Sequence, residues 1–457
     1  MSVEVVNPWS DEVEYRYDYQ GAEAVESALA RAQAAFPAWS ALALEERAAF
    51  VRRIAAAMRQ HRERIAGIMT AEMGKLRREA LAEIEKSAGA CDYYADHAGD
   101  YLRDQSIPTE ATRSYVSYEP LGCVFAVMPW NFPIWQVFRF LAPALMAGNV
   151  ALLKHATNVP RCADAIAEML ALAGVPEGVF GVLHIDNAMA AKVIADPRVH
   201  AVTLTGSERA GRSVASTAGQ HLKKCVMELG GSDPFVVLDD ADLDKTIPVA
   251  IGSRFANAGQ TCIAAKRFIV TEGIADEFVR RFVEAASKLQ VGDPNADGTT
   301  LAPMVRADLR DELHGQVQRS IAAGAKPLLG CEPGQGASHY PASILDRVAP
   351  GMPAYDEELF GPVAGVIRVK DEAEAVRVAN DTVFGLSSGI CTASLRQARE
   401  FKRRSRAGMV MINLPTAGVD YHVPFGGTKG SSHGSREQGR HAVEFYTTVK
   451  TAYSFAG

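Results

Sequence analysis

Two successive alternations of short apolar runs and helical segments constrain the fold of this chain most strongly. The first begins near residue 121, and the second runs from near 232 past Asn413. Apolar runs that alternate with helices form parallel sheets, because the returning helices cover both faces of the sheet. The apolar runs of the first alternation are Cys123–Met128, Asn149–Lys154, Val179–Ile185, Ala201–Thr205 and Cys225–Leu229. We therefore predict two α/β domains, the first built on a parallel, doubly wound sheet.

The segments outside these alternations have other patterns. Residues 22–100 read as alanine-rich amphipathic helices with many Arg and Glu residues, which is typical of an outer layer. Arg113–Glu119 and Glu444–Tyr453 are rich in Tyr, Thr and Val but too isolated to form sheets alone. We expect these two segments to pair and to extend towards another subunit, because exposed strand edges need covering.

Composition excludes several classes of function. The 457 residues are 48% hydrophobic, and the formal net charge of -6 includes no long basic run, which argues against nucleic-acid or membrane binding. Seven scattered cysteines without a Cys-x-x-Cys pair indicate a reduced compartment, and no metal site is expected. Residues 1–8 have no signal-peptide pattern, so we expect a cytoplasmic protein with a small-molecule partner.

Cys262 is the strongest candidate for a reactive residue. Small and polar neighbours, Gly259, Gln260 and Thr261, precede it, as expected where a loop enters a buried helix. A helix amino terminus there would lower the pKa of the thiol and favour a nucleophilic thiolate. The alternative is a small buried hydrophobe, because cysteine is among the most buried residue types.

Two other polar residues follow apolar strands. Glu228 closes the run Val226–Leu229, and its side chain can enter the crevice beyond the strand ends where open α/β sheets bind ligands. Asn131 lies in the turn Trp130-Asn131-Phe132-Pro133, where a neutral amide can stabilise an oxyanion. The alternatives are a solvated acid for Glu228 and a helix cap for Asn131.

A turn containing Gly206 and Ser207 follows an apolar strand and opens a helix. Its spacing is not the Gly-x-Gly-x-x-Gly dinucleotide fingerprint. Backbone N–H groups at such a helix start still bind a pyrophosphate, although many similar turns are purely structural.

These motifs occur in an order that resembles the aldehyde dehydrogenase superfamily over essentially the whole chain. The ordered motifs are Trp130-Asn131-Phe132-Pro133, Lys154, Gly206-Ser207, Glu228-Leu229-Gly230-Gly231, Gly259-Gln260-Thr261-Cys262, Glu358-Leu359-Phe360-Gly361-Pro362 and Pro424-Phe425-Gly426-Gly427. The first two thirds are most similar to succinate-semialdehyde dehydrogenases. The segment 413–422 is more similar to the α-ketoglutarate-semialdehyde (2,5-dioxopentanoate) enzymes.

The resemblance implies an α/β fold with a Rossmann-type cofactor domain, an α/β catalytic domain and a small β bridging element that forms homodimers or homotetramers. The implied boundaries are 1–102 and 120–230 for the NAD(P)-binding domain, 231–430 for the catalytic domain, and 103–119 and 431–457 for the bridging element.

The resemblance also implies catalytic roles. Cys262 attacks the aldehyde carbon, and the Asn131 amide and the backbone N–H of Cys262 hold the oxyanion. Glu228 activates the water that hydrolyses the resulting thioester. Relatives that transfer the acyl group to coenzyme A typically lack this glutamate, so a free carboxylic acid is the expected product.

The implied cofactor is NADP or NAD. Ser207, next to Gly206, matches the pyrophosphate contact, Lys154 the adenine-ribose contact and Glu358 the nicotinamide-ribose contact. Thr157 stands where many NAD-selective relatives have a glutamate that repels a 2′-phosphate, which leaves room for NADP. The other implied cofactor residues are Trp130, Leu229 and Phe360.

The resemblance favours succinate semialdehyde as the substrate. The alternatives are 2,5-dioxopentanoate, which also has a distal acid, and a broad-specificity aldehyde dehydrogenase. Arg139 stands where some succinate-semialdehyde enzymes have a carboxylate-binding arginine, and Phe425 is a second candidate substrate contact. The alternative for Arg139 is a helix arginine that reaches solvent. A non-catalytic binding protein on the same fold is the rival class of function.

Overall fold

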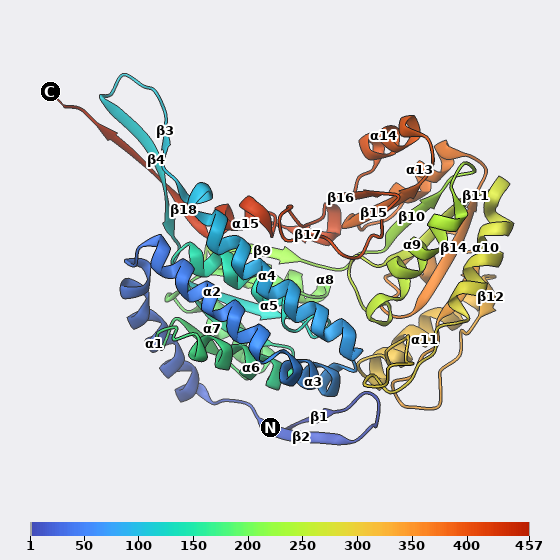
Figure 1. Ribbon diagram of the computed structural model, residues 1–457, viewed down its shortest axis with the longest axis horizontal. Helices are drawn as coiled ribbons and strands as arrows, with labels where there is room; N and C mark the ends of the chain where they lie inside the picture. Colours follow the sequence, from blue (N-terminus) through green and yellow to red (C-terminus); the bar gives the residue numbers. More distant parts are fainter. Residues whose placement is uncertain (1, 457) are drawn as a thin grey trace.

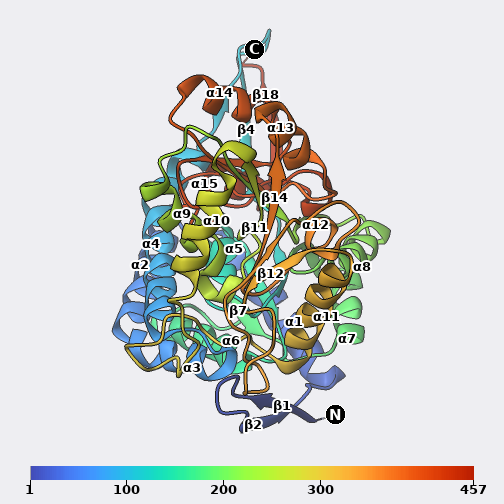
Figure 2. The same ribbon diagram turned by 90° about the vertical axis from the view of Figure 1, so that its right-hand side faces the viewer.

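The computed structural model describes residues 2–456, which form two α/β halves side by side and a β arm that projects from the first half (Figures 1 and 2). This arrangement confirms the predicted α/β class. The loops that carry Asn131 and Gln260 meet between the two halves.

The first half is built on a six-stranded sheet in the order β17-β9-β8-β5-β6-β7. All its strands are parallel except β17, which pairs with β9 in the antiparallel direction. The predicted doubly wound sheet is therefore present, with one short added edge strand. Its strands are β5 (Cys123–Met128), β6 (Val150–His155), β7 (Phe180–Val182), β8 (Val199–Thr205), β9 (Lys224–Glu228) and β17 (Ser432–His433).

Helices surround this sheet. The amino-terminal helices α1 (Ala22–Ser40), α2 (Leu44–Gln60), α3 (Arg62–Met73) and α4 (Arg77–Leu102) form the predicted outer layer. Beneath α4 lies α5, in which every residue is buried, so an almost wholly apolar helix separates α4 from the sheet, whereas α1 packs directly on β6. The helices that follow the strands are α5 (Trp135–Met146), α6 (Pro160–Leu172), α7 (Asn187–Ala195) and α8 (Glu208–Gln220).

The second half contains a seven-stranded sheet in the order β12-β13-β14-β11-β10-β15-β16, in which only the β12–β13 pairing is antiparallel. Both faces are covered, because neighbouring residues of one strand enter different cores. Phe235 belongs to one apolar cluster and Val236 to the other. The strands are β10 (Asp233–Val237), β11 (Ala265–Thr271), β12 (Lys326–Leu329), β13 (Ser343–Asp346), β14 (Val363–Val369), β15 (Ser387–Cys391) and β16 (Met409–Ile412).

The α-helices of this half are α9 (Leu243–Phe255), α10 (Glu272–Ala286), α11 (Ala307–Ala322), α12 (Pro353–Asp356), α13 (Glu372–Asn380) and α14 (Leu395–Arg404). Two short 3-10 helices, η1 (Ala256–Gly259) and η2 (Lys429–Ser431), interrupt the loops. None of the helices within residues 2–456 combines the length and the apolar character that a membrane crossing requires.

The projecting arm joins the two isolated β segments of the sequence. Strand β18 (Thr447–Ser454) pairs antiparallel with β4 (Arg113–Pro120), which also pairs with β3 (Gln105–Ser106), so the predicted pairing is confirmed (Figure 1). Not all of 431–457 lies in the arm. Strand β17 belongs to the first sheet, and α15 (Gly439–Phe445) packs on α4 and α5.

A hairpin that the sequence reading missed lies at the opposite end of the molecule (Figure 1). It consists of β1 (Ser2–Val6) and β2 (Val13–Asp18), and its loop reaches the second half. There Trp9 stacks on His339 with ring centroids 4.7 Å apart, and the Asp11 carboxylate accepts a hydrogen bond from the Ala337 N–H. The hairpin therefore connects the two halves directly.

Candidate active site

Two loops from different halves meet at the turn between β5 and α5. The Asn131 side-chain amide donates to the Gln260 carbonyl at 3.0 Å. In return, the Asn257 amide donates to the Asn131 carbonyl at 3.0 Å. These reciprocal bonds hold the Asn131 turn against the loop that leads to Cys262.

A buried cation supports the same turn. The Lys75 ammonium donates to the Asn131 carbonyl at 2.9 Å and forms an ion pair with Glu83 of α4. The Glu83 carboxylate also accepts the N–H groups of Ile134 and Trp135, each at 2.9 Å. These N–H groups lie at the start of α5 and have no partner within the helix, so Glu83 caps α5 and fixes its entry.

The loop that carries the cysteine has an unusual backbone. Asn257 and Ala258 both have φ of 53°, and Gly259 has φ of 70°, so three consecutive residues adopt the left-handed region. Only Gly259 does so without cost. A Cβ at Gly259 would also collide with Arg254 and the carbonyl of Gly361, which explains the glycine there.

Cys262 does not begin a helix. It lies in a turn between η1 and β11, and the predicted helix amino terminus at this position is wrong because the left-handed residues end the helical backbone before it. The predicted lowering of the thiol pKa is wrong as well. Burial against Ile263, Leu386 and Phe425 raises the pKa of the Cys262 thiol to about 12, while the charges of Lys266 and Arg139 oppose this rise.

Cys262 is the junction of two cavities and the only residue within 2–456 that lines both. Most of the predicted cofactor and oxyanion residues line the first cavity. They are Trp130, Asn131, Gly206, Ser207, Leu229, Glu358 and Phe360. The predicted substrate residues Arg139 and Phe425 line the second. A cysteine that lines two cavities can react with a group in one while a second group is bound in the other.

Donors for an oxyanion lie next to this sulfur. Within residues 2–456 the backbone N–H of Cys262 has no protein acceptor, and the Asn131 amide has only the Gln260 carbonyl as its acceptor. Asn131 is 4% exposed, so its amide acts where water does not screen it. The two groups fit the expected role in holding a negative oxygen.

Glu228 lies behind the cavity walls rather than on them. It ends β9 and is 2% exposed, and one of its oxygens accepts a hydrogen bond from the Ser432 hydroxyl at 2.8 Å. Its other oxygen has no partner within residues 2–456. Burial raises the pKa of Glu228 to about 8, and the positive charge of Arg139 opposes this rise. Such a group accepts a proton near neutral pH once it is ionised.

The first cavity has the features of a dinucleotide site. Ser207 caps α8, and its hydroxyl accepts from the Ala210 N–H at 3.3 Å, so the helix amino terminus opens on the cavity beside Gly206. Trp130 and Phe360 face each other edge to face with ring centroids 5.7 Å apart. A carboxylate, aromatic walls and a helix amino terminus suit a ribose, a nicotinamide ring and a pyrophosphate respectively.

Lys154 and Thr157 lie outside the lining of both cavities. Lys154 lies near the carboxyl end of β6, where it is the register partner of Val127 in β5, the strand that leads to the Trp130 turn. Burial lowers the pKa of the Lys154 ammonium. Thr157 is held by the Tyr17 hydroxyl, which donates to its carbonyl at 2.9 Å.

Three cations line the second cavity: Lys75, which is paired with Glu83, the buried Arg139 and the partly buried Lys86. Arg139 is 2% exposed, so the alternative of an arginine that reaches solvent is wrong. Its guanidinium donates to the Thr205 hydroxyl at 2.6 Å and lies 4.8 Å from the centre of the Phe425 ring. The sequence reading missed Lys86, whose ammonium lies 4.3 Å from the ring centre of Trp135 and also lines this cavity.

Several supporting residues gave only a weak signal in the sequence. Lys266 stands four positions after Cys262 in a buried strand that also contains Arg267, and a charge inside a buried strand needs a partner. Lys75, Glu83 and Lys86 lie in a helical region rich in charges, where nothing distinguishes them from solvated residues. Their burial depends on distant segments.

Comparison with known proteins agrees with this geometry. The model of the aldehyde dehydrogenase family matches residues 1–452. The chain belongs to the aldehyde dehydrogenase family.

Several members of the aldehyde dehydrogenase family are similar over nearly their full length. The succinate semialdehyde dehydrogenase (NAD(P)+) Sad of Escherichia coli (strain K12) is 45% identical over 98% of this chain and 97% of that protein. A probable succinate-semialdehyde dehydrogenase (NADP(+)) of Synechocystis is 44% identical, over 99% of this chain and 100% of that protein. In the crystal structure of succinic semialdehyde dehydrogenase from Streptococcus pyogenes with NADP+, the protein is 35% identical in sequence. The two structures superpose with a TM-score of 0.96 over 98% of this chain and 99% of that chain.

Replacing Lys75 tests the support of the Asn131 turn. Lys75→Met leaves the Glu83 charge buried without its partner, so we expect the free energy of unfolding to fall by about 3–5 kcal/mol. Urea unfolding measures the change. Lys288→Met is the matched control, because Lys288 is 72% exposed and its loss should cost under about 0.5 kcal/mol. Equal stability of the two variants would contradict the support role.

Replacing Glu228 tests the proton acceptor. The wild-type turnover should rise as pH increases through about 8, because the carboxylate must be ionised to accept a proton. Glu228→Gln should lower turnover by about 10²–10⁴-fold and remove this rise. Steady-state rates between pH 6 and 9.5, with pre-steady-state bursts of reduced cofactor, measure both. A variant that keeps the wild-type pH profile would rule out this role.

Proposed function

We propose that this aldehyde dehydrogenase oxidises an aldehyde that carries a distal carboxylate, most directly succinate semialdehyde, to the acid with NADP or NAD. The main support is Cys262, the only residue within 2–456 that lines both the cofactor-like cavity and the cavity that contains Arg139 and Lys86. The names of the similar proteins point to the same substrate. An alternative substrate is 2,5-dioxopentanoate, which also carries a distal carboxylate.

In the proposed mechanism Cys262 attacks the aldehyde carbon as a thiolate. The Asn131 amide and the Cys262 N–H receive the negative oxygen of the thiohemiacetal. When bound, NADP or NAD would accept the hydride that the thiohemiacetal carbon loses as it becomes a thioester. The resulting thioester reacts with a water molecule whose proton passes to Glu228, and the acid leaves as the Cys262 thiolate is restored.

The cofactor assignment uses the residues of the first cavity. Ser207 and the amino terminus of α8 suit the pyrophosphate, and Glu358 suits the nicotinamide ribose. We infer contacts from Lys154 and Thr157 to the adenosine side. Thr157 brings no negative charge against a 2′-phosphate, which supports use of NADP.

Substrate choice rests on Arg139 and Lys86 in the second cavity. Arg139 is buried and Lys86 is partly buried; the Lys86 ammonium donates to the Val419 carbonyl at 2.7 Å but forms no ion pair within residues 2–456. Burial lowers the pKa of the Lys86 ammonium to about 8. A carboxylate that enters this cavity would therefore gain charge-assisted hydrogen bonds that a neutral aldehyde cannot form.

We also infer a homodimer or homotetramer in the cytoplasm. The arm of β3, β4 and β18 carries exposed Val449 and Tyr453, and a projecting three-stranded sheet gains stability by pairing with another subunit. All seven cysteines are free, which suits a reducing compartment.

Direct turnover tests the proposed reaction. The protein with succinate semialdehyde and NADP or NAD should raise the absorbance at 340 nm without coenzyme A. Cys262→Ala should lower this rate by at least about a thousandfold, because the nucleophile is absent. A strict need for coenzyme A would indicate an acyl-transferring enzyme, and no reduced cofactor with any aldehyde would indicate a binding protein.

Two variants test the recognition of the distal acid. Arg139→Ala and Lys86→Met each remove a charge, and each should reduce the kcat/KM ratio of succinate semialdehyde to butanal by roughly 30-fold. Because the Arg139 charge also acts on Glu228, the ratio rather than the absolute rate is the measurement. Equal losses for both aldehydes would remove the assigned role.

A further inference from the structure

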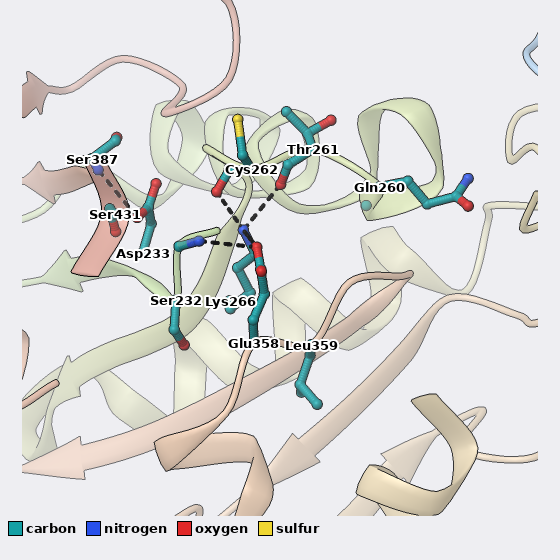
Figure 3. Close-up of polar contacts among 12 residues, drawn as sticks. Ser232, Asp233, Gln260, Thr261, Cys262, Lys266, Glu358, Leu359, Ser387 and Ser431 are labelled. Atoms are coloured by element: carbon teal, nitrogen blue, oxygen red, sulfur yellow. Dashed lines mark hydrogen bonds and ion pairs between the residues drawn. The ribbon is translucent and has the colours of Figure 1, made fainter. Parts of the chain in front are cut away.

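Lys266 is a fully buried ammonium that binds the main-chain carbonyls on both sides of the Cys262 Cα. It lies near the start of β11 and donates to the Cys262 carbonyl at 2.6 Å and to the Thr261 carbonyl at 3.0 Å. Figure 3 shows the Cys262 sulfur pointing away from Lys266 while the carbonyl oxygen faces it. The ammonium thus fixes the orientation of the nucleophile's main chain without blocking its sulfur.

The same ammonium is bound to the wall of the first cavity. Lys266 forms an ion pair with Glu358 at 3.3 Å, and that carboxylate oxygen also accepts the Gly231 N–H at 3.0 Å. Glu358 lines the cofactor-like cavity and its side chain is 20% exposed, whereas Lys266 is sealed from water. One cation therefore connects a group that a ligand can reach with the peptide that carries Cys262 (Figure 3).

The charges around Cys262 are of both signs. Lys266 and Arg139 lower the pKa of its thiol, and Glu358 and Asp233 raise it. Asp233 is 1% exposed and accepts the Ser387 N–H at 3.1 Å.

More distant charges share the second cavity with the thiol. They are Lys75, Glu79, Glu83 and Lys86. Glu228 lies behind the cavity walls. Lys266 alone among these groups both bonds to the Cys262 main chain and pairs with a carboxylate of the first cavity.

We propose that Lys266 is a positioning residue that couples the Glu358 side of the cofactor cavity to the reactivity of Cys262. Its hydrogen bonds orient the peptide whose N–H faces the oxyanion, and its charge favours the thiolate. A bound ribose that draws the Glu358 carboxylate away from Lys266 would leave the ammonium charge less compensated. The Cys262 thiolate would then be more stable. The proposal rests on the nucleophilic role proposed above for Cys262.

Thiol alkylation without cofactor tests this coupling. Iodoacetamide transfers its acetamide group to the thiolate and releases iodide, so the rate follows thiolate formation. Mass spectrometry of the peptide that carries Cys262 separates it from the other cysteines. At pH 8, Lys266→Met should slow alkylation about tenfold, roughly one unit of thiol pKa, whereas Glu358→Gln should accelerate it about threefold or more. Shifts in the same direction, or none, would overturn the proposal.

Further variants separate charge from structure. Lys266→Arg keeps the charge and should retain the wild-type pH profile of alkylation within roughly threefold, and the exposed Lys288→Met should match the wild type. If Lys266→Met does not fold, the acceleration by Glu358→Gln still decides the sign of the effect.

Adding NADP tests the connection to the ligand. NADP should accelerate alkylation in the wild type and have a smaller effect in Lys266→Met, whereas equal effects in both would refute the coupling. The proposed function can fail separately, because a Cys262→Ala variant with wild-type turnover would remove the nucleophile assignment while the alkylation comparison still measures the influence of Lys266.

Discussion

The carbonyl oxygen of Asn131 is the point on which the geometry of the site depends. It accepts hydrogen bonds from Lys75, which precedes α4, and from Asn257 in the cysteine loop. A buried carbonyl needs such partners, and here they come from positions 56 and 126 residues away in the sequence. The outer helices, the first sheet and the second half therefore meet at one atom beside the thiol.

Withdrawal from water acts on both reactive groups in the same direction. It raises the pKa of Cys262 to about 12 and that of Glu228 to about 8, so both hold their protons more firmly than they do in water. Arg139 opposes the rise for both groups. A resting enzyme of this kind protects its thiol from chance oxidation and depends on nearby cations when the reaction begins.

The sequence was most informative where local pattern and fold agree. The apolar runs marked the strands of both sheets, and the ordered motifs marked most of the cavity wall. The backbone at Asn257 and Ala258 was not predictable, because ordinary residues adopt left-handed conformations only when distant contacts hold them there. Lys266 was equally hidden, since its burial depends on Glu358, 92 positions later. Tertiary contacts, rather than propensity, decided these features.

The meeting of two chambers at Cys262 also determines how the protein can be blocked. An alkyl group on Cys262 would add bulk at the residue that both compartments share. Electrophilic inhibitors designed for either compartment would therefore compete for the same anchoring atom. Selectivity between such compounds would come from the walls beyond Cys262, where Glu358 lies in one compartment and Arg139 in the other.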